Sequence, residues 1–132
     1  MKNARHSVLI VDDNSGIRKL LQEVLSNEGY YVATAASGQE ALMQVQRELP
    51  DLVLLDLKMP RINGFELKQK LKEIDKNIRI IIVSGYAEQE LVKDIIKQNA
   101  DYVLSKPFDL EELQNVVAKL LNSKQTTRPT VE

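Results

Sequence analysis

The chain has 132 residues, which is the size of one ordinary domain. Its hydrophobic share of 43% and charged share of 28% are close to globular averages, which argues against extensive disorder. A formal net charge of -1 gives no electrostatic reason to expect nucleic acid binding. With no cysteine and a single histidine, His6, the composition excludes disulfide bonds, thiolate metal sites and sites built from several histidines.

The domain boundaries follow from the distribution of apolar residues. No apolar run approaches the ~20 residues of a membrane span. The run at 8–11 is too short for the apolar region of a signal peptide, so a cytoplasmic protein is expected. We predict an N-terminal extension at 1–6, one domain at 7–122, and a polar, disordered tail at 123–132.

Short apolar runs alternate with segments of helical period. The runs lie at 8–11, 30–35, 52–55, 78–83 and 102–104, and three of them are nearly unbroken, as in parallel strands covered on both faces. Apolar residues at helical spacing follow each run, at 17–25, 41–49, 65–74, 91–96 and 110–121. This alternation predicts an α/β fold, with a parallel five-stranded sheet and helices on both faces.

Local signals mark several helix ends. Ser37 with Glu40, and Asp109 with Glu112, have the spacing of capping boxes, in which side chains satisfy the first free N–H groups of a helix. Gly29 stands where the first predicted helix should stop. These signals support the boundaries that the apolar spacing suggests.

Polar residues follow four of the five predicted strands, and sites in open parallel sheets form at the carboxyl ends of strands. They are Asp12 and Asp13 after the first strand, Asp56 after the third, Ser84 after the fourth and Lys106 after the fifth. The amino ends are expected to carry only scattered polar residues, namely Ser7, Asp51 and Arg79. The sequence therefore predicts a site at one end of the sheet.

The predicted set of side chains suits phosphoryl transfer. Three carboxylates held together repel one another, and a hard cation such as Mg²⁺, which Mn²⁺ can replace, relieves that repulsion. A carboxylate can attack phosphorus, while a lysine such as Lys106 neutralises phosphoryl oxygens. Each residue alone is better explained as an ordinary turn or helix-start residue, but their joint placement favours the site. The chain has no glycine-rich nucleotide loop and no nucleophile elbow.

The motifs LIVDDN, LVLLDLKMP, IIIVSG and LSKPF, in this order, resemble the receiver domain of two-component response regulators. The resemblance covers about 7–121 and implies a (βα)5 flavodoxin-like fold with strand order 2-1-3-4-5. It also implies that Asp56 accepts a phosphoryl group from a phosphohistidine of a sensor histidine kinase or a histidine phosphotransferase. Such a protein is not a conventional enzyme, although it promotes its own phosphorylation and dephosphorylation.

The resemblance further implies a set of metal ligands. Asp13 matches a direct Mg²⁺ ligand, and Asp12 a residue that acts partly through water. Asp56 and the backbone carbonyl of Lys58 match the remaining protein ligands. Lys58 and Tyr86 also match positions that control access of water to the phosphoryl group, and their bulk predicts slow hydrolysis.

Other matched positions concern switching. Ser84 matches the hydroxyl that turns toward the phosphoryl group, Lys106 the lysine that pairs with it, and Pro107 a proline that follows through a cis bond. The family usually has an aromatic residue where this chain has Val103. The neighbouring Tyr102 should face the other side of the strand, so switching is expected to use loop and helix shifts instead.

The segments DDNSGIRKLLQEVLSNEGY and KPFD are similar to the single-domain regulators of sporulation phosphorelays in Bacillus. That similarity implies an apolar docking patch for a phosphotransferase, made of Ile17, Leu20, Pro107 and Phe108. Core packing is the alternative explanation for Leu20 and Phe108. A receiver module within a larger regulator or hybrid kinase, with an attached output domain, is the alternative to a stand-alone protein. A pseudo-receiver that docks without phosphorylation is a third.

Overall fold

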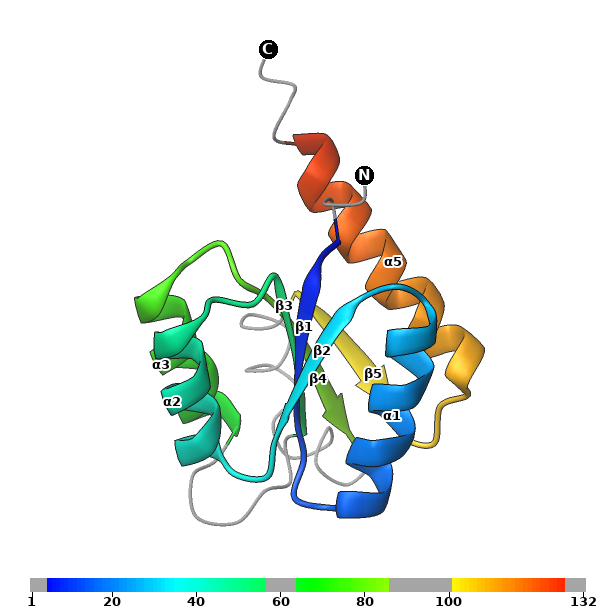
Figure 1. Ribbon diagram of the computed structural model, residues 1–132, viewed down its shortest axis with the longest axis horizontal. Coiled ribbons are helices and arrows are strands. Elements are labelled where there is room, and N and C mark those ends of the chain that lie inside the picture. The colour runs from blue at the N-terminus through cyan, green and yellow to red at the C-terminus, as the bar shows by residue number, and fades with distance from the viewer. Residues whose placement is uncertain (1–4, 57–63, 86–100, 128–132) are drawn as a thin grey trace.

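The computed structural model describes residues 5–56, 64–85 and 101–127, apart from the side chains of 64–65 and 123–127. Five parallel strands form one sheet in the order β2-β1-β3-β4-β5 (Figure 1). Their bounds are β1 (Ser7–Val11), β2 (Tyr31–Ala35), β3 (Leu52–Asp56), β4 (Arg79–Ser84) and β5 (Tyr102–Ser105). The expected sheet and its strand order are confirmed.

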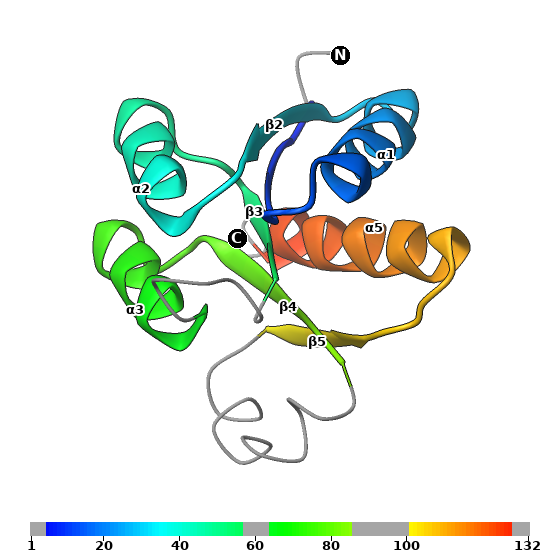
Figure 2. The same cartoon turned by 90° about the horizontal axis from the view of Figure 1, so that it is seen from below.

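Helices cover both faces of this sheet, as predicted (Figure 2). They are α1 (Ser15–Asn27) and α5 (Leu110–Thr127) on one face, and α2 (Gly38–Arg47) and α3 (Gly64–Ile74) on the other. The helix expected around 91–96 lies outside the described residues. No helix within the described ranges has the length and apolar character needed to cross a bilayer.

The central strand β3 explains why its sequence is an unbroken apolar run. Val53 and Leu55 pack into the cluster beneath α2 and α3, whereas Leu52 and Leu54 pack into the cluster beneath α1 and α5. Successive side chains of a strand point to opposite faces, and here both faces are covered. All five residues of β3 are therefore buried, including Asp56 at its end.

Side-chain caps begin two of the helices as predicted. The Ser37 hydroxyl accepts a hydrogen bond from the backbone N–H of Glu40 at 3.1 Å. The Asp109 carboxylate accepts one from the N–H of Glu112 at 2.8 Å. After α1, Gly29 adopts a φ of 101°, a left-handed conformation that glycine enters without a Cβ clash.

Two helix ends differ from the sequence expectation. Helix α2 ends at Arg47, so Leu49 lies beyond it and is exposed, because a residue before proline avoids helical dihedrals. Helix α5 continues through 123–127, which the expected disordered tail included, since no glycine or proline interrupts it before Pro129. In the expected extension, the Arg5 guanidinium stacks 4.4 Å from the centre of the Tyr31 ring.

The amino ends of the strands are more ordered than the sequence suggested. Asp51 precedes β3 and accepts a hydrogen bond from the N–H of Ser7 at 2.9 Å. Asp101 precedes β5 and accepts one from the N–H of Ile80 at 2.7 Å, while Lys72 of α3 reaches the same carboxylate oxygen at 3.2 Å. The expectation of scattered polar residues there is wrong, because each aspartate joins its own strand to a neighbour.

Replacing Asp101 with alanine should destabilise the domain, because the N–H of the fully buried Ile80 loses its acceptor. A buried donor left without a partner costs about 1–3 kcal/mol. The free energy of unfolding in urea measures this loss. The control is Asp75→Ala, which removes only a hydrogen bond from the exposed N–H of Asn77. Equal losses in the two variants would contradict the structural role of Asp101.

Candidate functional site

Three carboxylates meet at the carboxyl end of the sheet. Strands β1 and β3 are neighbours, with Val11 paired to Leu55, so the next residues, Asp12 and Asp56, lie side by side. One oxygen each from Asp12, Asp13 and Asp56 lies within 4.8 Å of the others. Asp12 and Asp56 are buried, with 5% of each residue exposed, whereas Asp13 is exposed. This group could hold a metal ion.

A lysine from the far side of the sheet reaches the same place. The Lys106 ammonium lies 3.4 Å from Oδ1 of Asp56, across β4. Its backbone N–H donates to the carbonyl of Ser84 at 2.9 Å, which ties the end of β5 to the end of β4. Ser84 itself is fully buried, and the Lys106–Pro107 peptide bond is cis, as the resemblance implied.

The charge state of Asp12 reflects its surroundings. Burial raises the pKa of the Asp12 carboxyl above its ordinary value, and the negative charges of Asp56 and Asp13 act in the same direction. The backbone N–H of Asn14 and the ammonium of Lys106 oppose this rise by stabilising the ionised form. Keeping Asp12 ionised in the folded protein therefore costs free energy, and a bound cation would reduce this cost.

Two residues near the acidic group were missed from the sequence. The backbone N–H of Asn14 donates to Oδ1 of Asp12 at 2.9 Å, and its own side chain caps α1 by accepting from the N–H of Ile17. Arg18 donates from Nη1 to the backbone carbonyl of Asp12 at 2.8 Å. The position of Asn14 before the helical spacing could have identified the cap, but no sequence signal indicated the contact of Arg18.

An apolar cleft of about 470 Å³ opens beside the acidic group, between α1 and the segment that joins β5 to α5. Ile17, Pro107 and Phe108 line it, together with Leu21 and the three site residues Asp12, Asp56 and Lys106. Leu20, which was expected in the same patch, does not line the cleft. It is 47% exposed and Ile17 is 37% exposed, so neither is a core residue, whereas Phe108 is half-buried against the core.

The remaining predicted positions fall into two groups. Val103 packs toward the α2 and α3 face and Leu104 toward the α1 and α5 face, so Tyr102 shares the side of Leu104, as expected from strand alternation. Lys58 and Tyr86 lie outside the described residues. The expectation of a long-lived phosphoryl group, which rests on their bulk, stays a prediction.

Comparison with known protein families shows which family the chain belongs to. The family described as response regulator receiver domain matches residues 8–118. The chain belongs to this family. Receiver domains are components of two-component and phosphorelay signalling. The chain therefore functions as a receiver domain in such signalling, as the order of its sequence motifs predicted.

The receiver is similar both to proteins of about its own length and to part of a longer protein. It is 45% identical to sporulation initiation phosphotransferase F of Bacillus subtilis, over 89% of this chain and 94% of that protein. It is 34% identical to the chemotaxis protein CheY of the same organism, over 89% of this chain and 98% of that protein. Among solved structures, NtrX from Brucella abortus superposes with a TM-score of 0.87 at 28% identity, covering 96% of this chain but 29% of NtrX.

Replacing Asp12 with asparagine should stabilise the metal-free receiver at neutral pH. The amide keeps an oxygen for the N–H of Asn14 and removes a buried charge. Because folding raises the pKa of Asp12, its contribution favours the folded state at acidic pH and is lost as pH rises through the raised pKa. The advantage of the variant should therefore grow from acidic to neutral pH.

Urea unfolding with a chelator present, across a pH series, measures this difference. Glu23→Gln, which removes an exposed carboxylate of α1, is the control and should shift the midpoint little at any pH. A variant of Asp12 less stable than the wild type at neutral pH would contradict the cost that we assign to the buried charge.

Proposed function

We propose that this receiver accepts a phosphoryl group on Asp56 from a phosphohistidine of a partner protein, in a reaction that depends on Mg²⁺. One observation carries the proposal: three carboxylate oxygens lie within 4.8 Å of one another, and the ammonium of Lys106 lies 3.4 Å from Asp56. In-line phosphoryl transfer requires mainly positioning and neutralisation of charge. The four strand ends supply both, beside the cleft that Asp56 and Lys106 line.

The acidic group suits Mg²⁺, and Mn²⁺ as a substitute, because both prefer oxygen ligands. We assign Asp12, Asp13 and Asp56 to the site, Asp12 partly through water, with the backbone carbonyl of Lys58 as a further ligand outside the described residues. When bound, the cation neutralises charge on the phosphoryl oxygens. The raised pKa of Asp12 supports this assignment, since the carboxylates repel one another without a counterion.

The side chains of the receiver divide the remaining work. A carboxylate oxygen of Asp56 attacks phosphorus, and the bond between phosphorus and the donor imidazole nitrogen breaks as the new P–O bond forms. Lys106 neutralises the oxygens of the transferred group, and the Ser84 hydroxyl donates a hydrogen bond to one of them. The chain thereby promotes its own phosphorylation. With Val103 at the usual aromatic position, the response passes through loop and helix shifts around Ser84 and the helix expected at 91–96, which lies outside the described residues.

The phosphoacceptor assignment is tested by incubation with Mg²⁺ and acetyl phosphate, followed by intact mass measurement. The wild type should gain one phosphoryl group and Asp56→Asn none, since an amide is not a nucleophile toward phosphorus. Asp75→Asn, at the other end of the sheet, is the matched control and should gain one. Labelling of Asp56→Asn, or no labelling of the wild type, would refute the proposal.

The partner surface is the apolar patch beside the site. Ile17 and Leu20 are exposed on α1, and Pro107 and Phe108 border the same cleft as Asp56. A helix that carries the donor histidine could rest on these side chains while its imidazole approaches Asp56. The likeness to sporulation initiation phosphotransferase F, over nearly its whole length, supports a role of this chain as a phosphoryl carrier between proteins.

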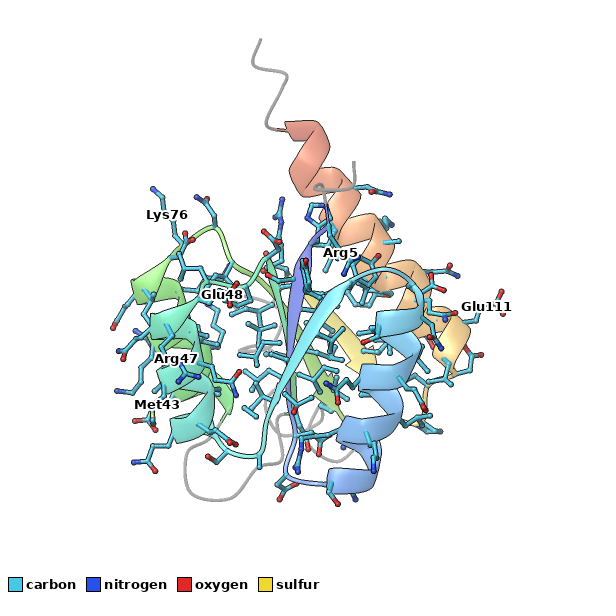
Figure 3. The ribbon with its side chains drawn as sticks, viewed as in Figure 1. Arg5, Met43, Arg47, Glu48, Lys76 and Glu111 are labelled. Carbon is cyan, nitrogen blue, oxygen red and sulfur yellow. The ribbon has the colours of Figure 1, made fainter. Side chains whose placement is uncertain are left out.

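Replacing Ile17 with aspartate should slow phosphorylation by the cognate kinase or phosphotransferase by tenfold or more, equivalent to about 1.4 kcal/mol, because a charge then faces an apolar partner. The rate of transfer measures this. Met43→Asp is the control, because Met43 is also exposed but projects from α2, on the other side of the molecule from α1 (Figure 3). Equal rates for both variants would remove Ile17 from the partner surface.

The second candidate function is a receiver module that controls an attached output domain. The observation that favours it is the likeness to NtrX, in which the matched region is 29% of a longer chain. The site chemistry is the same in both cases. Whether the reading frame continues beyond Glu132 distinguishes them.

A further inference from the structure

Asp12 is held at each of its polar groups. Its backbone N–H donates to the carbonyl of Ala35 at 3.1 Å, which ties it to the end of β2. Its carboxylate accepts from the backbone N–H of Asn14 at 2.9 Å. Its backbone carbonyl accepts from Nη1 of Arg18 at 2.8 Å. The first two contacts use backbone donors that many sequences would supply, so Arg18 is the side chain on which this arrangement depends.

The position of Arg18 is unfavourable for its helix. It lies at the end of the first turn of α1, where the helix dipole disfavours a positive charge. The other helices of the described ranges have glutamates in their first turns, whereas α1 has no acidic residue there. Arg18 is also half-buried, which costs hydration of its guanidinium. A compensating interaction is needed, and the carbonyl of Asp12 supplies one.

The bond from Arg18 also orients Asp13. The carbonyl of Asp12 and the N–H of Asp13 belong to one planar peptide unit. Holding that oxygen therefore sets the direction in which the chain enters Asp13, whose carboxylate is exposed. Without this restraint, repulsion among the three carboxylates would favour rotation of Asp13 away from Asp56.

We propose that Arg18 is a positioning residue for the metal site, acting through the peptide that joins Asp12 to Asp13. This inference rests on the proposed function of the acidic group. The guanidinium acts through the backbone carbonyl of Asp12, to which it donates at 2.8 Å, and we assign it no role as a ligand. It keeps two ligands in place before the cation arrives, so that less free energy is spent on ordering them when it binds.

The test compares Mg²⁺ binding by the wild type, Arg18→Gln, Arg18→Lys and Lys19→Gln. Lys19 is the matched control, because it is the next residue, is exposed, and carries the same charge. Arg18→Gln should weaken Mg²⁺ binding roughly tenfold, as loss of a residue that orients metal ligands commonly does. Lys19→Gln should change it less than about twofold, since exposed charges are screened. Arg18→Lys should lie between, because it keeps the charge without the planar guanidinium.

Isothermal titration with Mg²⁺ gives the affinity, and acetyl phosphate labelling at increasing Mg²⁺ gives a second readout. In Arg18→Gln, the Mg²⁺ concentration for half-maximal labelling should rise more than the maximal rate falls. A change in global stability alone would not raise the required Mg²⁺ concentration more than it lowers the maximal rate. The urea midpoint of each variant is measured as well, to report its global stability.

The outcomes separate the two claims. If the Asp13→Asn variant binds Mg²⁺ as tightly as the wild type does, both the proposed site and the role of Arg18 are wrong. If binding depends on Asp13 but Arg18→Gln binds Mg²⁺ as Lys19→Gln does, the metal site stands and the role of Arg18 is overturned. If Arg18→Lys binds as the wild type does, the effect is that of charge, and positioning by the guanidinium is overturned.

Discussion

The buried carboxylate of Asp56 is the feature on which the rest of the site depends. It ends a strand whose other residues are apolar and covered on both faces, so little water reaches it. An ionised carboxylate in such a place must be compensated by charge or by hydrogen bonds. The ammonium of Lys106 at 3.4 Å supplies part of that compensation, and a cation held with Asp12 and Asp13 would supply more. The carboxylate of Asp56 also lines the cleft beside the acidic group.

The two ends of the sheet use aspartate in opposite ways. At the amino ends, Asp51 and Asp101 accept hydrogen bonds from backbone N–H groups of neighbouring strands, which makes them structural. At the carboxyl ends, Asp12, Asp13 and Asp56 gather their carboxylates within 4.8 Å of one another. Satisfied carboxylates stabilise a fold, whereas clustered ones reduce its stability until a ligand binds. The aspartates at the amino ends of the strands therefore stabilise the domain, whereas those at the carboxyl ends repel one another. The carboxyl ends are where we propose that phosphoryl transfer occurs.

Most of the architecture could be predicted because the local patterns agree with the global fold. Unbroken apolar runs such as 52–55 indicate strands covered on both faces, and caps such as Ser37 mark helix starts. Errors arose where a neighbouring residue decided the outcome. Pro50 ends the helical conformation before Leu49, and an uninterrupted polar segment lets α5 continue past 122. The polar residues at the amino ends looked scattered because hydrogen bonds between distant segments leave no periodic trace in a sequence.

The sequence by itself determined the strands and helices, the family, and the residues at the carboxyl ends of the strands, because these depend on spacing and residue type along the chain. The tertiary structure decided which of those residues meet. It brought Lys106 to Asp56 across fifty positions of sequence, and it turned Arg18 back onto the carbonyl of Asp12. It also excluded Leu20 from the lining of the cleft and included Leu21. These outcomes depend on side-chain directions and distances, which are set only when the helices pack onto the sheet.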